Sequence, residues 1–215
     1  LMRVYGREAF KFYQASTSEL FGNTQYCDID GKLDETTPMA PTSPYAIAKH
    51  SAYLTVKMYR EAFGVYAVNG ILFNHESPRR GEDFVTRKIT KYVAAGDYRK
   101  PLRLGNLNAL RDWGDARDYV KAMHLMMTGS GGWCGGDDFV VSTGTARSVR
   151  EFVEAAFHCV GLPPLQWDGN GVEEQGFIVR TSPLVVVDPE YYRPSEVNRL
   201  RGSPYKIEST LGWTR

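Results

Sequence analysis

Tyr45 and Lys49 are the residues of this chain whose types and spacing most directly suggest chemistry. Side chains four positions apart share one face of a helix, so the ammonium group would be held beside the phenol. A neighbouring cation favours the phenolate and lowers the pKa of a tyrosine from about 10, which would make Tyr45 a general base near neutral pH. A second pair with the same spacing, Tyr53 and Lys57, is a reminder that the pattern can equally be an ordinary solvated helix face.

The segment around the first pair carries the signals of a helix that begins at Pro44. Ser43 is a good N-cap because its hydroxyl can accept a hydrogen bond from an unpaired backbone N–H. Proline suits the first helical position, and Gly64 can close the helix at its other end. We therefore predict a helix from Pro44 to about Phe63.

The predicted helix lies between two predicted strands, at residues 9–17 and 65–73. The second is a nearly continuous apolar run, which is typical of a buried strand in a parallel sheet. Strand, helix and strand form a βαβ unit, and ligands bind such sheets beyond the carboxyl ends of the strands. Tyr45 and Lys49 would lie at this ligand edge. The second pair, roughly 12 Å further along the helix axis, would be a surface feature.

The rest of the chain indicates alternating helices and strands joined by polar loops. The predicted helices are 84–95, 116–127 and one opened by a capping box of Ser148 and Glu151; the predicted strands are 102–105, 138–142 and 184–187, with 166–187 otherwise irregular. Residues 18–42, 74–81 and 105–114 are predicted as loops, and the first is longer than most, which often indicates function. The charged segment 74–81 is either a solvated loop or a phosphate or ribose site. The glycine-rich stretch 129–138 lacks the GxGxxG pattern and is predicted as a surface insertion.

Composition and charge exclude several classes of function. The chain has 215 residues, 42% hydrophobic and 24% charged, with a formal net charge of +1, so nothing favours nucleic acid or an anionic membrane. Its three cysteines and four histidines form no metal-binding spacing, and no apolar run is long enough to span a bilayer. We therefore expect no metal, no membrane and no nucleic acid partner. Unpaired cysteines and the lack of a visible signal peptide predict a cytoplasmic protein.

Three segments together resemble the GDP-mannose 4,6-dehydratases, a family of extended short-chain dehydrogenase/reductases. They are YQASTSELFG at 13–22, SPYAIAK at 43–49 and NGILFNHESPRRG at 69–81. The Tyr-x-x-x-Lys pair is shared by the wider superfamily, whereas the run NHESPRRG is highly specific. The similarity continues through FVTRKI, LGNL, RDWG and YRPSEV and covers nearly the whole chain.

The resemblance implies a reaction and a role for each catalytic residue. Family members oxidise C4 of GDP-mannose, remove water across C5 and C6, and return the hydride to C6, so that bound NADP is regenerated. Tyr45 would take the proton of the 4-hydroxyl, Lys49 would assist it and hold the nicotinamide ribose, and Thr17 would hydrogen-bond the C4 oxygen. Glu19 would be the base at C5 and then the acid for the departing C6 hydroxyl. The product, GDP-4-keto-6-deoxymannose, would feed GDP-fucose and GDP-deoxyhexose synthesis.

The same resemblance implies the binding residues. Those matched to GDP contacts are Asn74, Lys88, Leu107 (through its backbone), Arg111, Arg193 and Glu196; those matched to NADP contacts, besides Tyr45 and Lys49, are His75, Glu76 and Arg80. GDP-mannose is the expected partner, together with further copies of the chain in a homo-oligomer, a dimer or a tetramer.

The expected fold class is α/β: the C-terminal part of an NAD(P)-binding Rossmann sheet plus a smaller, mixed α/β substrate-binding domain. Residues 1–75 would form the partial Rossmann domain with the catalytic residues, and residues 76–215 mainly the nucleotide-sugar domain, with 111–145 able to return to the Rossmann sheet. The GxGxxG segment of the family is absent, so we expect this chain alone to bind NADP poorly and to be inactive. Two alternatives stay open: another nucleotide-sugar dehydratase or epimerase, and a non-catalytic GDP-sugar-binding fragment.

Overall fold

The computed structural model describes residues 6, 10–28, 30–129, 135–179, 182–192 and 197–215. The chain divides into two compact units. Unit 1 contains Leu1–Ser77, Asp112–Ala146 and Arg199–Arg215, and unit 2 contains Pro78–Arg111 and Arg147–Asn198. Residues 112–146 and 199–215 thus return to the unit that holds the first 77 residues.

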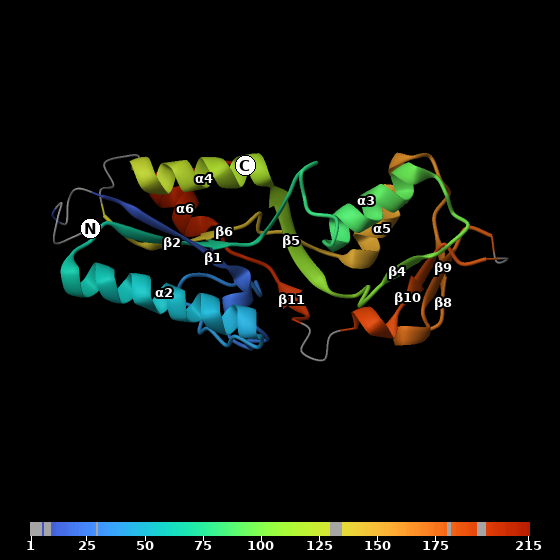
Figure 1. Cartoon of the computed structure of the whole chain (residues 1–215), viewed down its shortest axis with the longest axis horizontal. Coiled ribbons are helices and arrows are strands. Elements are labelled where there is room, and N and C mark those ends of the chain that lie inside the picture. The colour runs from blue at the N-terminus through green and yellow to red at the C-terminus, as the bar shows by residue number, and fades with distance from the viewer. Residues whose placement is uncertain (1–5, 7–9, 29, 130–134, 180–181, 193–196) are drawn as a thin grey trace. The chain divides into compact units, whose positions relative to one another are not determined.

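Unit 1 is built on a parallel sheet with the order β1-β2-β6, formed by β1 (Phe12–Thr17), β2 (Ala67–Leu72) and β6 (Asp138–Val141). All six residues of β2 are buried, as the apolar run predicted for a central parallel strand. Helix α2 (Pro44–Phe63) covers one face of this sheet, and α4 (Ala116–Thr128) with α6 (Tyr205–Leu211) covers the other (Figure 1). The α/β class expected from the sequence is confirmed.

Both ends of α2 are fixed by the residues that predicted them. The Ser43 hydroxyl accepts a hydrogen bond from the Ala46 N–H at 3.1 Å, and Pro44 occupies the first turn. Gly64 adopts the left-handed conformation with φ +62°, which a glycine reaches without a Cβ clash, and donates to the Arg60 carbonyl. Because these contacts are local in sequence, the predicted bounds are confirmed.

A second sheet has the order β11-β5-β3 and is formed by β3 (Asn74–Glu76), β5 (Leu110–Asp115) and β11 (Arg199–Leu200), with β7 (Ala146–Ser148) also paired to β5. The prediction of loops at 74–81 and 105–114 was wrong at these strands. Asn74–Glu76 pairs in parallel with Trp113–Asp115, and neither segment alternates apolar and polar residues. Each strand is stabilised by its partner, which is distant in sequence, so local pattern did not indicate either one.

A short 3₁₀ helix, η1 (Ser18–Phe21), begins directly after β1. Leu20 and Phe21 are fully buried, and the Phe21 ring packs on that of Phe73, with 6.2 Å between the ring centroids. The polar loop that follows therefore starts from a segment that is fixed in the core of unit 1.

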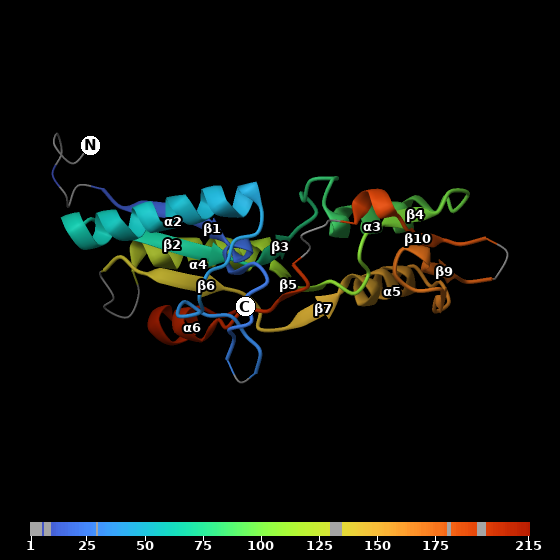
Figure 2. The same cartoon turned by 90° about the horizontal axis from the view of Figure 1, so that it is seen from below.

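Unit 2 contains two helices that pack on each other, α3 (Val85–Ala95) and α5 (Val149–Cys159), as Figure 2 shows. Its sheet has the order β4-β10-β9-β8 and is formed by β4 (Leu102–Leu104), β8 (Gln166–Asp168), β9 (Gln175–Phe177) and β10 (Val185–Val187), with short 3₁₀ turns η2 (Gly171–Glu173) and η3 (Pro189–Tyr191). The capping box of Ser148 and Glu151 is confirmed. The segment 166–187 is more regular than predicted, because β8 and β9 pair antiparallel within it.

Two further predictions concern the glycine-rich stretch 129–138 and membrane-spanning segments. Residues 130–134 of the glycine-rich stretch lie outside the described residues. Within the described part of the chain, no helix combines the length and the apolar character that crossing a bilayer requires.

Candidate active site

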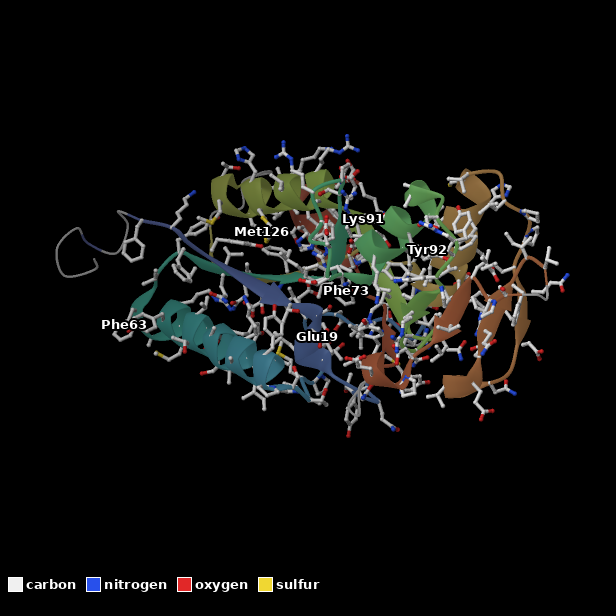
Figure 3. All side chains as sticks on the ribbon, turned by 45° about the vertical axis from the view of Figure 1, so that its right-hand side comes forward. Glu19, Phe63, Phe73, Lys91, Tyr92 and Met126 are labelled. Atoms are coloured by element: carbon white, nitrogen blue, oxygen red, sulfur yellow. The ribbon has the colours of Figure 1, made fainter. Side chains whose placement is uncertain are left out.

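Thr17 and Glu19 lie together at the carboxyl end of β1. Thr17 is the N-cap of η1, and its hydroxyl oxygen accepts a hydrogen bond from the Glu19 N–H at 3.2 Å. A hydroxyl that accepts one bond still has its proton to donate, so Thr17 can serve as a donor to another oxygen. Glu19 is half-buried, and Figure 3 shows it on the blue segment after β1. The buried side chains of Leu20 and Phe21 hold this segment in place.

Tyr45 and Lys49 lie in the first two turns of α2, which packs against both β1 and η1. Lys49 Nζ donates to the backbone carbonyl of Ala15 at 2.9 Å and lies 5.8 Å from the centroid of the Tyr45 ring. The bond to Ala15 ties the ammonium group to the end of β1. Tyr45 is 54% exposed, so its phenol is accessible from solvent.

Unit 1 thus brings together a phenol, an ammonium group, a hydroxyl donor and a carboxylate at one edge of a parallel sheet. This is the edge at which ligands bind α/β sheets. The set can take a proton from an alcohol, hydrogen-bond the resulting oxygen, and move a second proton with the carboxylate. The arrangement therefore has the groups for an oxidation coupled to an elimination.

The second pair, Tyr53 and Lys57, is not the surface feature that the sequence predicted. Lys57 is exposed and lies 3.9 Å from Glu61, but Tyr53 is only 6% exposed. Its hydroxyl donates to Asp138 Oδ2 at 2.8 Å. Burial and the neighbouring Asp138 carboxylate raise the pKa of Tyr53, so its phenol stays neutral. Tyr53 holds α2 against the sheet instead of facing solvent.

Asn74, His75 and Glu76 form β3 of unit 1, and all are half-buried. His75 Nδ1 lies 2.8 Å from the Phe73 carbonyl oxygen, which only accepts, so Nδ1 carries the hydrogen. In neutral His75 this leaves Nε2 as an acceptor. The ring also stacks on Tyr119, with 4.8 Å between the centroids. The histidine expected at the cofactor is therefore held in one orientation by its own unit.

Among the described residues, four of the predicted binding residues lie in unit 2. The Arg80 guanidinium lies 3.6 Å from the Phe84 ring centroid, and Lys88 Nζ lies 3.7 Å from that of Tyr191. Both cations thus pack on an aromatic face. Of the other predicted residues, Arg193 and Glu196 lie outside the described residues.

The remaining two residues of unit 2 use part of their hydrogen-bonding capacity on the protein itself. Leu107 is 1% exposed, and its carbonyl accepts from the Arg150 N–H at 2.9 Å. Arg111 donates through one amino group to the carbonyls of Leu110 and Val197, at 2.9 and 2.6 Å.

Sequence reasoning missed three carboxylates of unit 1 that hold these elements together. Asp138 and Asp112 are 6% and 0% exposed, and Glu35 is half-buried. The available signal was weak: Asp138 opens an otherwise apolar strand, Asp112 follows an arginine, and Glu35 lies in a polar loop. Among the described residues, no cluster of His, Cys, Asp and Glu side chains could hold a metal ion.

The sequence of the whole chain, residues 1–215, matches the family described as GDP-mannose 4,6 dehydratase. A relative from Dictyostelium discoideum, named GDP-mannose 4,6 dehydratase, is 51% identical over 206 residues, which cover 94% of this chain and 55% of the relative. The chain therefore spans about half the length of the curated relatives it matches.

Solved structures share the fold at lower identity. That of dTDP-glucose 4,6-dehydratase from Bacillus anthracis in complex with NAD has a TM-score of 0.74 and 20% identity, and the match covers 95% of this chain and 56% of that one. That of RMD from Pseudomonas aeruginosa with NADPH has a TM-score of 0.69 and 20% identity over 95% of this chain and 60% of that one. With its full-length family match and relatives near half identity, this chain belongs to the GDP-mannose 4,6-dehydratase family.

Proposed function

We propose that this chain carries the catalytic residues of an NADP-dependent GDP-mannose 4,6-dehydratase. The observation that supports this most is the packing of η1, with Thr17 and Glu19, against the turns of α2 that hold Tyr45 and Lys49. A dehydrogenase that only oxidises an alcohol has no use for a carboxylate on η1, the segment that packs against α2. Glu19 is therefore the argument for loss of water.

The residues at the sheet edge fit the nicotinamide ribose end of a dinucleotide. An ammonium group has three N–H donors, and the bond to Ala15 uses one, so Lys49 can also donate to ribose hydroxyls. Exposure of Tyr45 leaves its phenol open to a ligand. When bound, the cofactor supplies a hydride acceptor for C4 and a hydride donor for C6. The choice of NADP over NAD rests on the family resemblance alone, because solved structures with this fold contain either NAD or NADPH.

In the first half of the proposed reaction, Tyr45 acts as the base. Its phenolate takes the proton of the 4-hydroxyl of the mannose ring as C4 is oxidised to a ketone. Lys49 stabilises the charged phenolate. The Thr17 hydroxyl donates a hydrogen bond to the C4 oxygen, which draws electron density from the ketone and makes the C5 proton more acidic.

In the second half, Glu19 moves one proton twice. Its carboxylate removes the proton from C5, and the carboxylic acid formed gives that proton to the C6 hydroxyl, which leaves as water. Glu19 is thereby returned to its starting state, and the sugar is now a 4-ketone with a double bond between C5 and C6. Return of the hydride to C6 then requires one proton at C5, and this balances the proton that Tyr45 took from the 4-hydroxyl. With that proton delivered, Tyr45 is a phenolate again and the product is a 4-keto-6-deoxy sugar.

The proposed GDP contacts follow from the family resemblance. Lys88 and Arg111 are cations suited to a diphosphate, and Leu107 would contribute through its backbone. Asn74, Arg193 and Glu196 complete the proposed GDP contacts, and His75, Glu76 and Arg80 the proposed cofactor contacts. Assembly into a dimer or tetramer is part of the same proposal.

A chimeric enzyme tests the catalytic proposal. The part of the Dictyostelium relative that lies outside the match would be joined to residues 1–215, and the joined enzyme would be supplied with GDP-mannose and NADP. We expect the joined enzyme to form the 4-keto-6-deoxy product, whereas this chain alone shows no useful turnover. Tyr45→Phe should lower kcat by roughly 10²–10⁴-fold.

Glu19→Gln separates the two halves of the reaction. This variant should still oxidise C4, visible as reduced nicotinamide absorbance, but should not release water. Glu61→Gln, on the exposed face of α2, is the matched control and should keep normal turnover. Full turnover by Glu19→Gln would contradict the role of Glu19, and an inactive joined enzyme would contradict the proposed function.

Calorimetric titration of this chain with GDP, GDP-mannose and NADPH separates an enzyme from a binding fragment. We expect weak binding of NADPH to the chain alone. Tight binding of GDP by the chain, together with an inactive joined enzyme, would instead indicate a non-catalytic fragment that retains GDP-sugar contacts.

A further inference from the structure

The loop between η1 and α2 joins the two halves of the candidate active site, and its ends are tied to each other. The Ala40 N–H donates to the Leu20 carbonyl at 2.9 Å. Gly22 has φ +54°, and a Cβ there would overlap the carbonyl oxygen of Ala40. The backbone that follows Glu19 and the backbone that precedes Tyr45 are therefore in direct contact at Gly22 and Ala40, and we call this contact the crossing of the loop ends.

The middle of this loop forms a tight turn at Asp34–Thr37. Asp34 Oδ1 accepts from the N–H of Thr36 at 2.9 Å and from the hydroxyls of Thr36 and Thr37 at 2.7 and 3.1 Å. The Thr37 hydroxyl oxygen in turn accepts from the Asp34 N–H at 2.9 Å. These bonds hold the backbone on both sides of Glu35, so the direction of its side chain is set by the turn.

Glu35 extends from the turn to the sheet. Its Oε1 accepts a hydrogen bond from the Val140 N–H at 2.6 Å, across 105 residues of sequence. Strand β6 is the outer strand of the order β1-β2-β6, and this N–H points away from β2. A carboxylate of the loop thus satisfies a donor at the edge of the sheet that also carries Thr17.

The surroundings of Glu35 indicate that this contact is built into the unit. Burial raises the pKa of Glu35, while the Val140 N–H and the Lys206 ammonium group favour the charged form and Asp34 opposes it. Next to it, Leu33 donates to the Arg201 carbonyl and accepts from the Ser203 N–H, each at 2.8 Å. The loop is therefore attached to β6 through one side chain and to residues 201–203 through its backbone.

We propose that Glu35 is a positioning residue, which anchors the loop to β6 and thereby fixes η1, with Thr17 and Glu19, relative to the start of α2, with Tyr45. The catalytic consequence rests on the proposed function, but the structural coupling does not. If Glu35 only protected the edge of β6, its loss would affect Val140 and leave the crossing of the loop ends unchanged. If it positions the site, its loss must loosen the crossing at Gly22 and Ala40.

Hydrogen exchange on the 215-residue chain decides between these roles. In Glu35→Ala, the amides of Gly22 and Ala40, which donate to Glu19 and Leu20, should exchange about tenfold faster than in the unsubstituted chain. Glu35→Gln keeps an acceptor oxygen and should restore slow exchange. Glu61→Ala, an exposed carboxylate on α2, should change neither amide. The free energy of unfolding of each variant, from urea denaturation, separates local loosening from global loss of stability.

Two outcomes would overturn the proposal: unchanged exchange at Gly22 and Ala40 in Glu35→Ala, or exchange in Glu35→Gln as fast as in Glu35→Ala. The joined enzyme adds a kinetic measurement. Glu35→Ala should lower kcat about tenfold with an unchanged KM for GDP-mannose, and Glu35→Gln should recover kcat. An inactive joined enzyme contradicts the proposed function, whereas the exchange data still test the positioning role.

Discussion

Asp138 and Asp112 are both buried carboxylates of unit 1, yet their surroundings shift their pKa values in opposite directions. Asp138 begins β6 and accepts hydrogen bonds from Tyr53 and Arg60 of α2 and from Asn69 of β2. Burial raises its pKa, but these donors, above all the Arg60 cation, lower it further than burial raises it. Asp138 is therefore an ion that joins a helix to a sheet.

Among the described residues, Asp112 accepts hydrogen bonds from neutral donors only. Its carboxylate accepts from the N–H and hydroxyl of Thr143 at 2.8 and 2.6 Å, and from the N–H groups of Gly144 and Gly202 at 2.9 and 3.3 Å. Burial raises its pKa, and these bonds offset that only in part. The comparison shows that the number of hydrogen bonds does not decide whether the pKa of a buried carboxylate is raised or lowered. The presence of a cation among the donors decides it.

The largest effect is expected from Asp138→Ala. Removing this carboxylate leaves the half-buried Arg60 guanidinium, 2.9 Å from it, without its partner. Breaking a buried pair on one side destabilises a protein by about 3–5 kcal/mol. Urea denaturation of the chain should show a loss of this size. A loss below about 1 kcal/mol would mean that solvent reaches Arg60 easily.

Asp112→Ala should destabilise the chain less, by roughly 1–3 kcal/mol, since it leaves unpaired neutral donors but no unpaired charge. The same denaturation experiment gives the ranking. Equal losses of unfolding free energy for the two aspartates would contradict this distinction, because the cation beside Asp138 would then contribute nothing to the difference in stability.

Tyr53→Phe removes one neutral donor from Asp138 and should lower the free energy of unfolding by about 1 kcal/mol. Tyr45→Phe is its matched control: Tyr45 is exposed, so its stability change should stay within about 0.5 kcal/mol. Substitution of Tyr53 should therefore lower the stability of the chain, whereas substitution of Tyr45 should lower the turnover of the joined enzyme. Loss of turnover without loss of stability in Tyr53→Phe would contradict this assignment.

The smallest effect is in the pH dependence of stability. The pKa of Asp112 is raised above its ordinary value of 3.8, so the folded state holds this proton more tightly than the unfolded state does. The contribution of Asp112 to the free energy of unfolding therefore falls as pH rises from 3.8 through the raised pKa. The lowered pKa of Asp138 gives the opposite sign: its contribution is present above 3.8 and is lost as pH falls through the lowered value. We would measure the free energy of unfolding against pH for the unsubstituted chain, Asp112→Asn and Asp138→Asn. The difference between the unsubstituted chain and each variant should change with pH, with slopes of opposite sign for the two variants. Slopes of the same sign would refute the assigned directions.

Much of the site's framework could be predicted from the sequence because it depends on local rules. The N-cap at Ser43, the glycine at position 64 and the apolar run of β2 gave the βαβ unit and the edge on which Thr17, Glu19, Tyr45 and Lys49 lie. The family could be inferred from motifs, and the comparisons confirmed it. The chemical roles of these residues stay predictions.

What local rules could not give are the pairings between distant segments. Strands β3 and β5 have no alternating pattern, and each forms because the other is present. Position along the helix predicted Tyr53 to be a surface feature, although it is buried against Asp138.

The sequence by itself thus determined where α2 begins and ends, which strands flank it, and which side chains lie at the sheet edge, because capping and hydrophobic periodicity act over a few residues. Only the tertiary structure decided that Asp138 pairs with Arg60, 78 residues away, and Glu35 with Val140, 105 residues away. The sequence around a carboxylate does not indicate which distant donor will hydrogen-bond to it. A buried carboxylate needs such a donor, because burying an unpaired charge is costly, and only the folded structure determines which donor it is.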